Sequence, residues 1–425
     1  MKKNQDFFKK TVFASALVLM FAACSDDSDE VTTTEFKNTE SMHLNVVKQY
    51  ADNVVVKNYV QLAEDAQSLL EAVKEIRNSS EENEKAKIEA AAKAWIAARN
   101  SWERTEAYLF GPVDTEAIDP GIDSWPLALA DIQSNIKSND WSAEDAYTLL
   151  SSDGGDTKGF HAIEYMLFSD GKAKESVDQF NKDYALDESV TEEKMKQYLV
   201  AVTEELYRCV LGLEKSWTGD VASDKASDYN KYKDSYSSTI QGYTKANNYA
   251  TGFRTMNYGE RASFTGAMTD ILSVGMSGIA EEVAGVKIAD PINAEKDKVG
   301  AGLLAVESWF SHNSVDDFTN NVRGIKEAYV GKLYSGESFD TDVTYAENSV
   351  AAYVNAGSPN LHSEVIRVAN NAISAVKAMK ENNRGAFRNN LKWDSVNTNA
   401  SEAVAALGDV MNKVLAAIQD GYYID

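Results

Sequence analysis

The class of fold is indicated by residues 195–217, which read MKQYLVAVTEELYRCVLGLEKSW. Apolar side chains recur there at intervals of three and four positions, the spacing that lines one face of an α-helix. These positions are Met195, Tyr198, Leu199, Val202, Leu206, Val210 and Leu213. A helix with one apolar face buries that face against other elements, so residues 191–217 are predicted to form a long helix of a helical bundle.

Similar spacing appears on both sides of this segment. Residues 55–76 show it clearly, and a second helix is predicted from Glu81 or Glu82 to about Phe110. In the C-terminal half, further helices are predicted over residues 264–283, 314–330, 361–379 and 403–418. Only five prolines occur in 425 residues, and the long proline-free stretches are rich in strong helix formers. The sequence therefore predicts an all-α protein.

The length of the chain favours two domains, because a single core rarely grows beyond about 250–300 residues. A break at Thr218-Gly219-Asp220 places the predicted boundary near residue 222. Residues 39–222 are then predicted to form an N-terminal helical bundle and residues 223–425 a C-terminal one, each with about four main helices. No residue-level repeat relates the two halves.

The N-terminus has the features of an export signal. Four lysines precede an apolar run over residues 11–23, which is too short to span a bilayer permanently. The run ends in FAAC, which is similar to a bacterial lipoprotein cleavage box, with Phe21 where leucine is usual. We therefore predict a signal peptide over residues 1–23, lipid attachment at Cys24 and a flexible acidic tether over residues 24–38.

These features predict an exported lipoprotein of the bacterial outer membrane, held there by the lipid on Cys24. The acidic residues directly after Cys24 resemble a surface-export signal, and a simple solvated linker is an equal alternative. The protein would then lie on the periplasmic side or at the cell surface. Lipidation of Cys24 would leave only Cys209, so no intramolecular disulfide is expected, and Cys209 is predicted to be a small core residue.

The overall charge excludes one class of partner. The formal net charge is −24 at pH 7, and removal of residues 1–23, which hold four lysines and one aspartate, would change it to −27. Such a surface repels nucleic acid and anionic lipid. No nucleic-acid partner is therefore expected.

The chemistry is concentrated in residues 159–168, which read GFHAIEYMLF. His161 and Glu164 are three positions apart, so on a helix they project from one face and can share a metal ion. An imidazole nitrogen and a carboxylate oxygen suit zinc or iron. Gly159 would let the backbone approach closely at the helix start. The alternative is an ordinary helix-surface contact, although the apolar neighbours favour burial, and a buried carboxylate needs a partner.

A second set of candidates lies on the helix predicted before Phe110. Trp95, Arg99, Trp102 and Glu106 step by four, three and four positions and therefore share one face. Arg99 and Glu106 either line the same cavity as His161 or belong to a buried hydrogen-bonded network that fixes packing. Glu103 lies to one side of this face and is expected to be solvated.

Asp123 is a further candidate acidic ligand. It stands two residues before Trp125, in a loop punctuated by prolines. An aspartate at this position also makes a good helix cap, which is the more common role. Both interpretations stay open.

These motifs together resemble the imelysin family, bacterial exported proteins first described as insulin-cleaving membrane proteases and related to components of iron uptake. The features that carry the resemblance are Gly159-x-His161-x-x-Glu164, Arg99, Thr105-Glu106, Phe110-Gly111 and Trp125-Pro126-Leu127. The resemblance implies a duplicated helical architecture and a link to iron. Two polar pairs also look similar to the family and could reach the site from the second domain, Glu260-Arg261 and Glu307-Ser308.

The leading hypothesis is a lipid-anchored protein that binds a metal ion, iron or zinc, or a small metal-bearing ligand, with a role in metal uptake. His161 is assigned as nitrogen ligand and Glu164 as carboxylate ligand. Arg99 would orient a carboxylate or hold an anionic ligand, and Glu106 would be a further ligand or the partner of Arg99.

Two other hypotheses stay open. A metal-dependent peptidase would use the same residues, but the H-E-x-x-H pattern is absent, and a catalytic zinc usually needs three protein ligands and a general base. A non-catalytic interaction protein would keep the polar cluster for structure alone.

Overall fold

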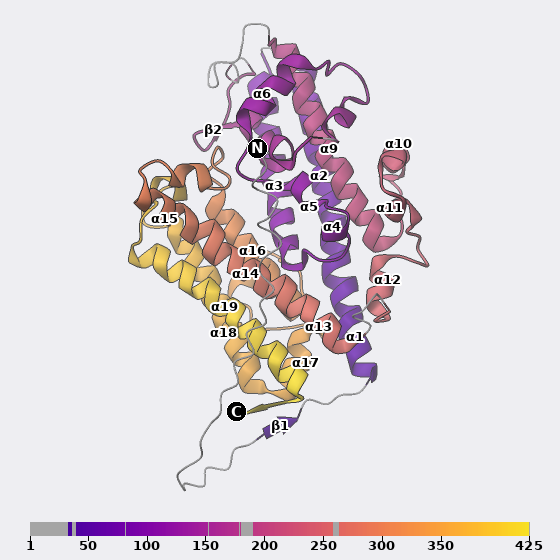
Figure 1. Ribbon diagram of the computed structural model, residues 1–425, viewed down its shortest axis with the longest axis vertical. Helices are drawn as coiled ribbons and strands as arrows, with labels where there is room; N and C mark the ends of the chain where they lie inside the picture. Colours follow the sequence, from indigo (N-terminus) through magenta and orange to yellow (C-terminus); the bar gives the residue numbers. More distant parts are fainter. Residues whose placement is uncertain are drawn as a thin grey trace.

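The computed structural model describes residues 33–35, 40–80, 82–151, 153–177, 179, 190–257 and 263–424. Its described part is built mostly of α-helices, as predicted (Figure 1). The predicted signal peptide (1–23), Cys24 and most of the predicted tether (24–38) lie outside the described residues. No helix of the described part is both long and apolar enough to cross a membrane.

Three long helices form the first packed group, and they run along the long axis of the molecule in Figure 1. They are α2 (Val56–Arg77), α3 (Glu84–Thr105) and α9 (Glu192–Thr218). The central helix, α2, packs against both α3 and α9. The side chain of Thr191 caps α9 by accepting a hydrogen bond from the Lys194 backbone, and Gly219 ends it in a left-handed conformation. The predicted helix over residues 191–217 is thus confirmed.

Shorter elements surround this group. The helices and turns are α1 (Glu40–Tyr50), a π-helical turn (Ala51–Val55), a 3₁₀ turn (Glu106–Tyr108), α4 (Pro112–Thr115), α5 (Asp119–Ile122), α6 (Leu129–Ser138), 3₁₀ turns (Ala146–Leu150, Gly155–Thr157), α7 (Gly159–Leu167), α10 (Ala226–Tyr232), a 3₁₀ turn (Lys233–Ser235), α11 (Ser238–Gly242) and α12 (Tyr249–Arg254). Among them, α7 packs against both α3 and α9. This packing buries the whole of α7, the helix that carries His161 and Glu164.

A second packed group is formed by the C-terminal helices. They are α13 (Phe264–Met268), a π-helical segment (Thr269–Ser277), α14 (Gly278–Glu281), a second π-helical segment (Glu282–Ala289), α15 (Asp290–Asp297), a 3₁₀ turn (Gly302–Ala305), α16 (Ser314–Val330), a 3₁₀ turn (Glu337–Thr341), α17 (Val350–Gly357), α18 (Pro359–Lys377), 3₁₀ turns (Ala378–Lys380, Phe387–Asn389) and α19 (Ser395–Asp420). In this group α18 packs against both α16 and α19, and α19 also packs against the segment around α14. The four C-terminal helices predicted from the sequence are all present.

The two groups meet where α16 packs against α3. Gly324 of α16 lies so close to the backbone of α3 that a Cβ atom at this position would collide with the Arg104 carbonyl. This close contact brings polar residues of the C-terminal half beside Arg99 and Glu103. The predicted division into two domains near residue 222 stays a prediction.

Strands contribute little to the fold. β1 (Thr33–Glu35) pairs antiparallel with β4 (Tyr422–Ile424) and so joins the two ends of the described chain. β2 (Phe168–Ser169) pairs with β3 (Lys172–Ala173) in a short hairpin directly after α7.

Candidate metal centre

The position of α7 is fixed at its first residue. Gly159 has a φ angle of 78°, which glycine adopts readily, and a Cβ atom there would collide with the Ile122 carbonyl. The start of α7 is therefore pressed against the end of α5. This contact places Asp123, the residue after α5, next to the His161 side chain. The close backbone approach predicted for Gly159 is confirmed.

His161 is fully buried and uses both ring nitrogens. Its Nδ1 atom lies 2.9 Å from Oε2 of Glu164. Its Nε2 atom lies 3.1 Å from Oδ1 of Asp123 and 3.4 Å from Oε1 of Glu307. The Trp125 ring packs edge-on against the imidazole, with centroids 4.9 Å apart. The ring is thus held so that Nε2 points at two carboxylates.

Glu164 ties α7 to the segment that precedes α16. Its Oε1 atom accepts hydrogen bonds from the backbone N–H groups of Phe310 (3.0 Å) and Ser311 (2.7 Å), and from the Ser311 hydroxyl (2.7 Å). The other oxygen faces His161. Both carboxylate oxygens therefore already have partners, which suits a residue that orients the imidazole. Direct binding of a metal by Glu164 stays a prediction.

Arg99 lies at the centre of an acidic cluster. Its guanidinium pairs with Asp123 and Glu103, lies 2.6 Å from Glu307 and 3.6 Å from Asp317. The other oxygen of Asp123 accepts a 2.7 Å hydrogen bond from the Trp102 indole. Asp123 ends α5 through its backbone N–H, which donates to the Asp119 carbonyl, but its carboxylate caps no helix of the described residues. Its carboxylate belongs to the cluster, as the ligand interpretation requires.

A second cation, Lys287, enters the cluster from the segment between α14 and α15. Its Nζ atom lies 3.1 Å from Glu106, 3.1 Å from Glu307 and 3.7 Å from Glu103. Asn321 of α16 donates hydrogen bonds to Glu103 and Glu106. The prediction that Glu103 is solvated is wrong, because both α16 and Lys287 pack over the side of α3 that carries it.

The pKa values of the buried acids depend on burial and on which cations lie beside each carboxyl group. Burial opposes ionisation of Glu307, but Lys287 and Arg99 together lower its pKa to about 2. Burial likewise opposes ionisation of Asp123, and Arg99 and His161 hold its pKa well below the usual range. Burial raises the pKa of Glu106 and of Asp317 well above the ordinary value. The lowered pKa values of Asp123 and Glu307 thus favour the ionised forms of these two acids beside the buried cations.

Two further groups of the site, His161 and Asp119, also have shifted pKa values. Burial and Arg99 act to lower the pKa of His161, but hydrogen bonds to Asp123, Glu164 and Glu307 raise it well above the ordinary value. Burial raises the pKa of Asp119 to about 7. The cluster also holds more carboxyl groups than cations, since five acids besides Glu164 contact Arg99, Lys287 or His161.

Two sets of ligand atoms in the described residues are close enough to hold a metal ion. Asp123, His161 and Glu307 each offer one atom, all within 4.8 Å of one another, and Glu103, Glu106 and Asp123 form a second such set. One imidazole nitrogen and two carboxylate oxygens fit the donors that iron and zinc accept. Because Arg99 and Lys287 contact the same oxygens, a metal ion would share these oxygens with them or displace them.

Most residues predicted for the site converge here, namely Arg99, Glu106, Asp123, Gly159, His161 and Glu164. Glu307, flagged through resemblance alone, also lies in the cluster, whereas Glu260 and Arg261 lie outside the described residues. Three further residues of the cluster, Lys287, Asp317 and Asn321, were not predicted from the sequence. Lys287 could have been recognised as a candidate in the sequence, because it is the one charged residue in the apolar run VAGVKIA, residues 283–289.

The family is settled by comparison with known proteins. Residues 55–414 match the family model described as Peptidase_M75, imelysin. The chain belongs to the imelysin family. This imelysin protein is 26% identical over 325 residues to iron-regulated protein A of Synechococcus elongatus, an alignment that covers 76% of this chain and 71% of the relative.

Solved structures agree with this assignment. A crystal structure from Parabacteroides distasonis, assigned as an iron-regulated protein A precursor, is 28% identical, with a TM-score of 0.73 and coverage of 90% of this chain and 97% of that one. An imelysin-like protein from Psychrobacter arcticum has a TM-score of 0.53 at 12% identity, covering 91% and 96% of the two chains. The second likeness concerns the fold alone.

Proposed function

We propose that this imelysin protein binds a divalent metal ion through His161, Asp123 and Glu307. The observation that carries the proposal is that Nε2 of His161 and one oxygen from each acid lie within 4.8 Å of one another in a buried site. They come from three separate segments of the chain, and the side chains are at most 8% exposed. Three converging donors of this kind form a plausible ligand set for iron or zinc.

The charge balance supports the same proposal. The side chains of five acids, Asp123, Glu307, Glu103, Glu106 and Asp317, are at most 8% exposed, and the described cations that contact them are Arg99, Lys287 and His161. Buried charge is costly unless it is paired. A divalent cation would supply further positive charge, and its ligands would bind it in their deprotonated forms.

Each neighbouring residue then has a defined role. Glu164 holds Nδ1 of His161 and so directs Nε2 toward the acids. Arg99 and Lys287 hold the carboxylates together in the absence of metal, and Arg99 could also pair with an anionic group of a metal-bearing ligand. Glu106 is a further ligand from the second set, and direct ligation by Glu164 is the alternative to its orienting role.

Iron is the favoured metal because two relatives carry the name iron-regulated protein A. A role in metal uptake follows from the same likeness. The N-terminal sequence adds the proposal that the protein is exported and anchored to the outer membrane through a lipid on Cys24. Zinc fits the donor atoms equally well, so the metal itself must be measured.

Peptidase activity is the second candidate, because the matching family model is described as a peptidase family. The geometry provides three candidate ligands, and Glu106, which lies beside them, is the candidate for the acid–base residue. The burial of the cluster opposes this function, since a polypeptide substrate would have to reach side chains that are at most 8% exposed.

The proposal is tested by calorimetric titration of the metal-stripped full-length protein with Fe²⁺ without oxygen, and separately with Zn²⁺. We expect one tight site that is lost in His161→Ala and retained in His43→Ala, which removes a partly exposed histidine of α1. Equal binding by parent and His161→Ala would refute the site. Cleavage of unfolded substrates that stops with chelator and in His161→Ala would instead favour the peptidase.

A further inference from the structure

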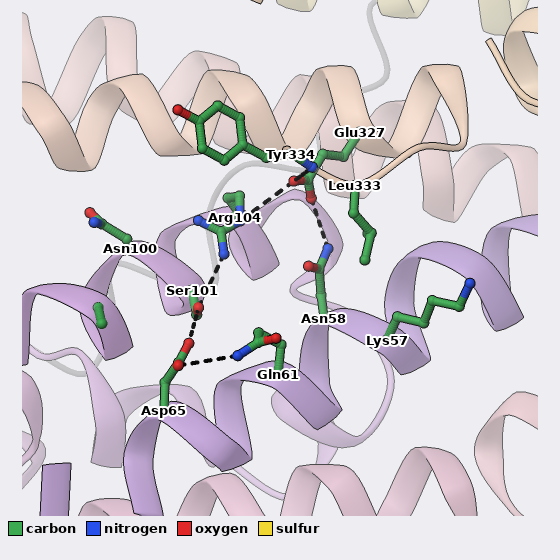
Figure 2. Close-up of a pocket in the computed structure, with 11 residues that line it drawn as sticks. Lys57, Asn58, Gln61, Asp65, Asn100, Ser101, Arg104, Glu327, Leu333 and Tyr334 are labelled. Atoms are coloured by element: carbon green, nitrogen blue, oxygen red, sulfur yellow. Dashed lines mark hydrogen bonds and ion pairs between the residues drawn. The ribbon is translucent and has the colours of Figure 1, made fainter. Parts of the chain in front are cut away.

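A separate cavity lies on the other side of α3 from the metal centre. Its volume is about 520 Å³, and it is bounded by α2, α3 and the residues from Glu327 of α16 to Tyr334. Figure 2 shows its lining, in which polar side chains predominate. Arg99 and Glu103 of α3 face the metal centre, whereas Asn100, Ser101 and Arg104 face this cavity. The volume falls in the range of small-molecule sites.

The wall of the cavity is a connected chain of hydrogen bonds (Figure 2). Gln61 donates to Asp65 (3.2 Å), which also accepts from Ser101 (2.5 Å). Arg104 donates to Ser101 (3.1 Å) and pairs with Glu327 (3.5 Å). These contacts fix the polar side chains in place before any ligand arrives, which lowers the entropic cost of binding.

The charges of the wall balance. Asp65 and Glu327 are the acids that line it, and Lys57 and Arg104 are the bases. An anionic ligand would meet the two acids, and a cationic ligand would meet the two bases. An apolar ligand would leave the polar wall unpaired. The balance therefore favours a ligand that is polar but uncharged.

Several polar atoms of the lining keep spare bonding capacity. Within the described residues, no protein group bonds to Nη1 of Arg104, Nδ2 of Asn100 or the Tyr334 hydroxyl, all of which can donate. Oε1 of Gln61 accepts no hydrogen bond from the part of the chain that the structure describes, since the bond to Asp65 uses the nitrogen of this amide. Donors and acceptors thus stand side by side along one wall.

We propose that this cavity binds a small carbohydrate of one or two sugar rings. A hydroxyl group both donates and accepts, so a sugar can use the mixed free groups of the wall without bringing a charge. The ring of Tyr334 already carries the Arg323 guanidinium 4.3 Å from its centroid, so the sugar would be held by the polar groups of the wall. This site shares no residue with the metal centre, so the inference is independent of the proposed function.

The test is saturation-transfer NMR on the full-length protein with glucose, galactose, N-acetylglucosamine and maltose, and with citrate as an anionic comparison. We expect at least one sugar to bind with a Kd of about 1 mM or tighter, and citrate not to bind. Ala97→Trp would place a large ring in the cavity from an exposed position of α3 and should weaken binding at least tenfold.

Ala90→Trp is the matched control, because Ala90 is also exposed on α3 and lies outside the cavity lining. Gln61→Ala is a milder second variant that removes one donor and one acceptor, and it should also weaken binding. The proposal is overturned if none of the four sugars binds at up to about 10 mM. Binding of citrate alone, or sugar binding that neither Ala97→Trp nor Gln61→Ala weakens, overturns it equally.

Discussion

The Nδ1 atom of His161 lies 2.9 Å from Oε2 of Glu164, one helical turn further along α7. The second oxygen of Glu164 is held by two backbone N–H groups that lie 146 and 147 positions away in the sequence. The direction of the imidazole is therefore fixed by the packing of the two halves of the chain. This relationship assigns different tasks to the two residues of the Gly-x-His-x-x-Glu motif.

Glu164→Gln should weaken metal binding by about 10- to 100-fold while the fold is retained. The glutamine oxygen can accept the hydrogen bonds from residues 310 and 311, which leaves its NH₂ group facing Nδ1 of His161. Nδ1 must then accept, so a neutral imidazole carries its proton on Nε2, the atom that faces Asp123 and Glu307. Calorimetry with Zn²⁺ and ¹⁵N NMR of the imidazole check this.

The control is Glu71→Gln, which makes the same change at an exposed position of α2. Its metal affinity should equal that of the parent. If Glu164→Gln binds metal as tightly as Glu71→Gln, the orienting role of Glu164 is wrong.

Lys287→Met should destabilise the metal-free protein by about 3–5 kcal/mol, because it removes the buried cation beside Glu106 and leaves Glu307 with Arg99 and His161 alone. A bound divalent cation would replace that charge. The increase in Tm on adding Zn²⁺ should therefore be larger in Lys287→Met than in the parent, as measured by thermal unfolding. Lys298→Met removes an exposed lysine and should behave like the parent. An equal increase in all three proteins would contradict the proposed charge balance.

Gly324→Ala should destabilise the protein by about 1–3 kcal/mol, although alanine is the better helix former. The added methyl group would collide with the backbone of α3 at Arg104, so α16 would have to move outward. Gly285→Ala provides the comparison, because nothing lies within 4 Å of its Cβ position. Chemical denaturation should show a loss of stability for the first variant and a small gain for the second. A gain for both would mean that α3 and α16 are not in tight contact.

Asp340→Asn should lower the free energy of unfolding at pH 7 by about 2–3 kcal/mol. Arg323 holds both oxygens of Asp340, at 2.8 and 2.7 Å, and Lys377 lies 2.9 Å from one of them. Burial opposes ionisation of Asp340, but these hydrogen bonds lower its pKa below the ordinary value. The ionised carboxylate therefore stabilises the folded state.

The pH dependence of this effect has a definite sign. The contribution of Asp340 is complete above about pH 4, the pKa of an unfolded aspartate, and is lost as the pH falls through the lower folded value. The difference in stability between parent and Asp340→Asn should thus be constant from pH 5 to 7 and shrink in more acidic buffer. Asp297→Asn, at an exposed position, should match the parent throughout. A difference that grows on acidification would contradict the assignment.

The helices could be predicted because their signal is local. The stripes over residues 55–76 and 195–213 each reflect one buried face, and both helices form where expected. Glu103 shows the limit of this reasoning. The prediction from apolar spacing assumes that a helix buries one face. However, α3 is covered by α2 on one side and by α16 and Lys287 on another. The spacing of residues within α3 carries no information about contacts with residues more than 180 positions away in the sequence.

The residues of the candidate site also fall into two groups: those that the sequence indicates and those that only the folded structure reveals. His161, Glu164 and Arg99 stand in recognisable local patterns, so they could be singled out from the sequence. Asp317 and Asn321 lie on one face of α16, but an acid and an amide four positions apart are common on solvated helices. Only tertiary packing shows that this face meets Arg99 and Glu103. The excess of buried acids, which carries the metal proposal, is likewise a property of the assembled chain.

The contact between Arg99 and Glu307 spans 208 positions, and it has a consequence for biosynthesis. A ribosome that has completed the first 300 residues has made His161 and Asp123 but not their third partner. The unfinished polypeptide therefore lacks the complete proposed ligand set, and on this proposal the ion is bound only after the last third of the chain has been made. Two separately expressed fragments, split within the exposed residues 296–299, should each bind the ion more weakly than the full chain and should recover its affinity on being mixed.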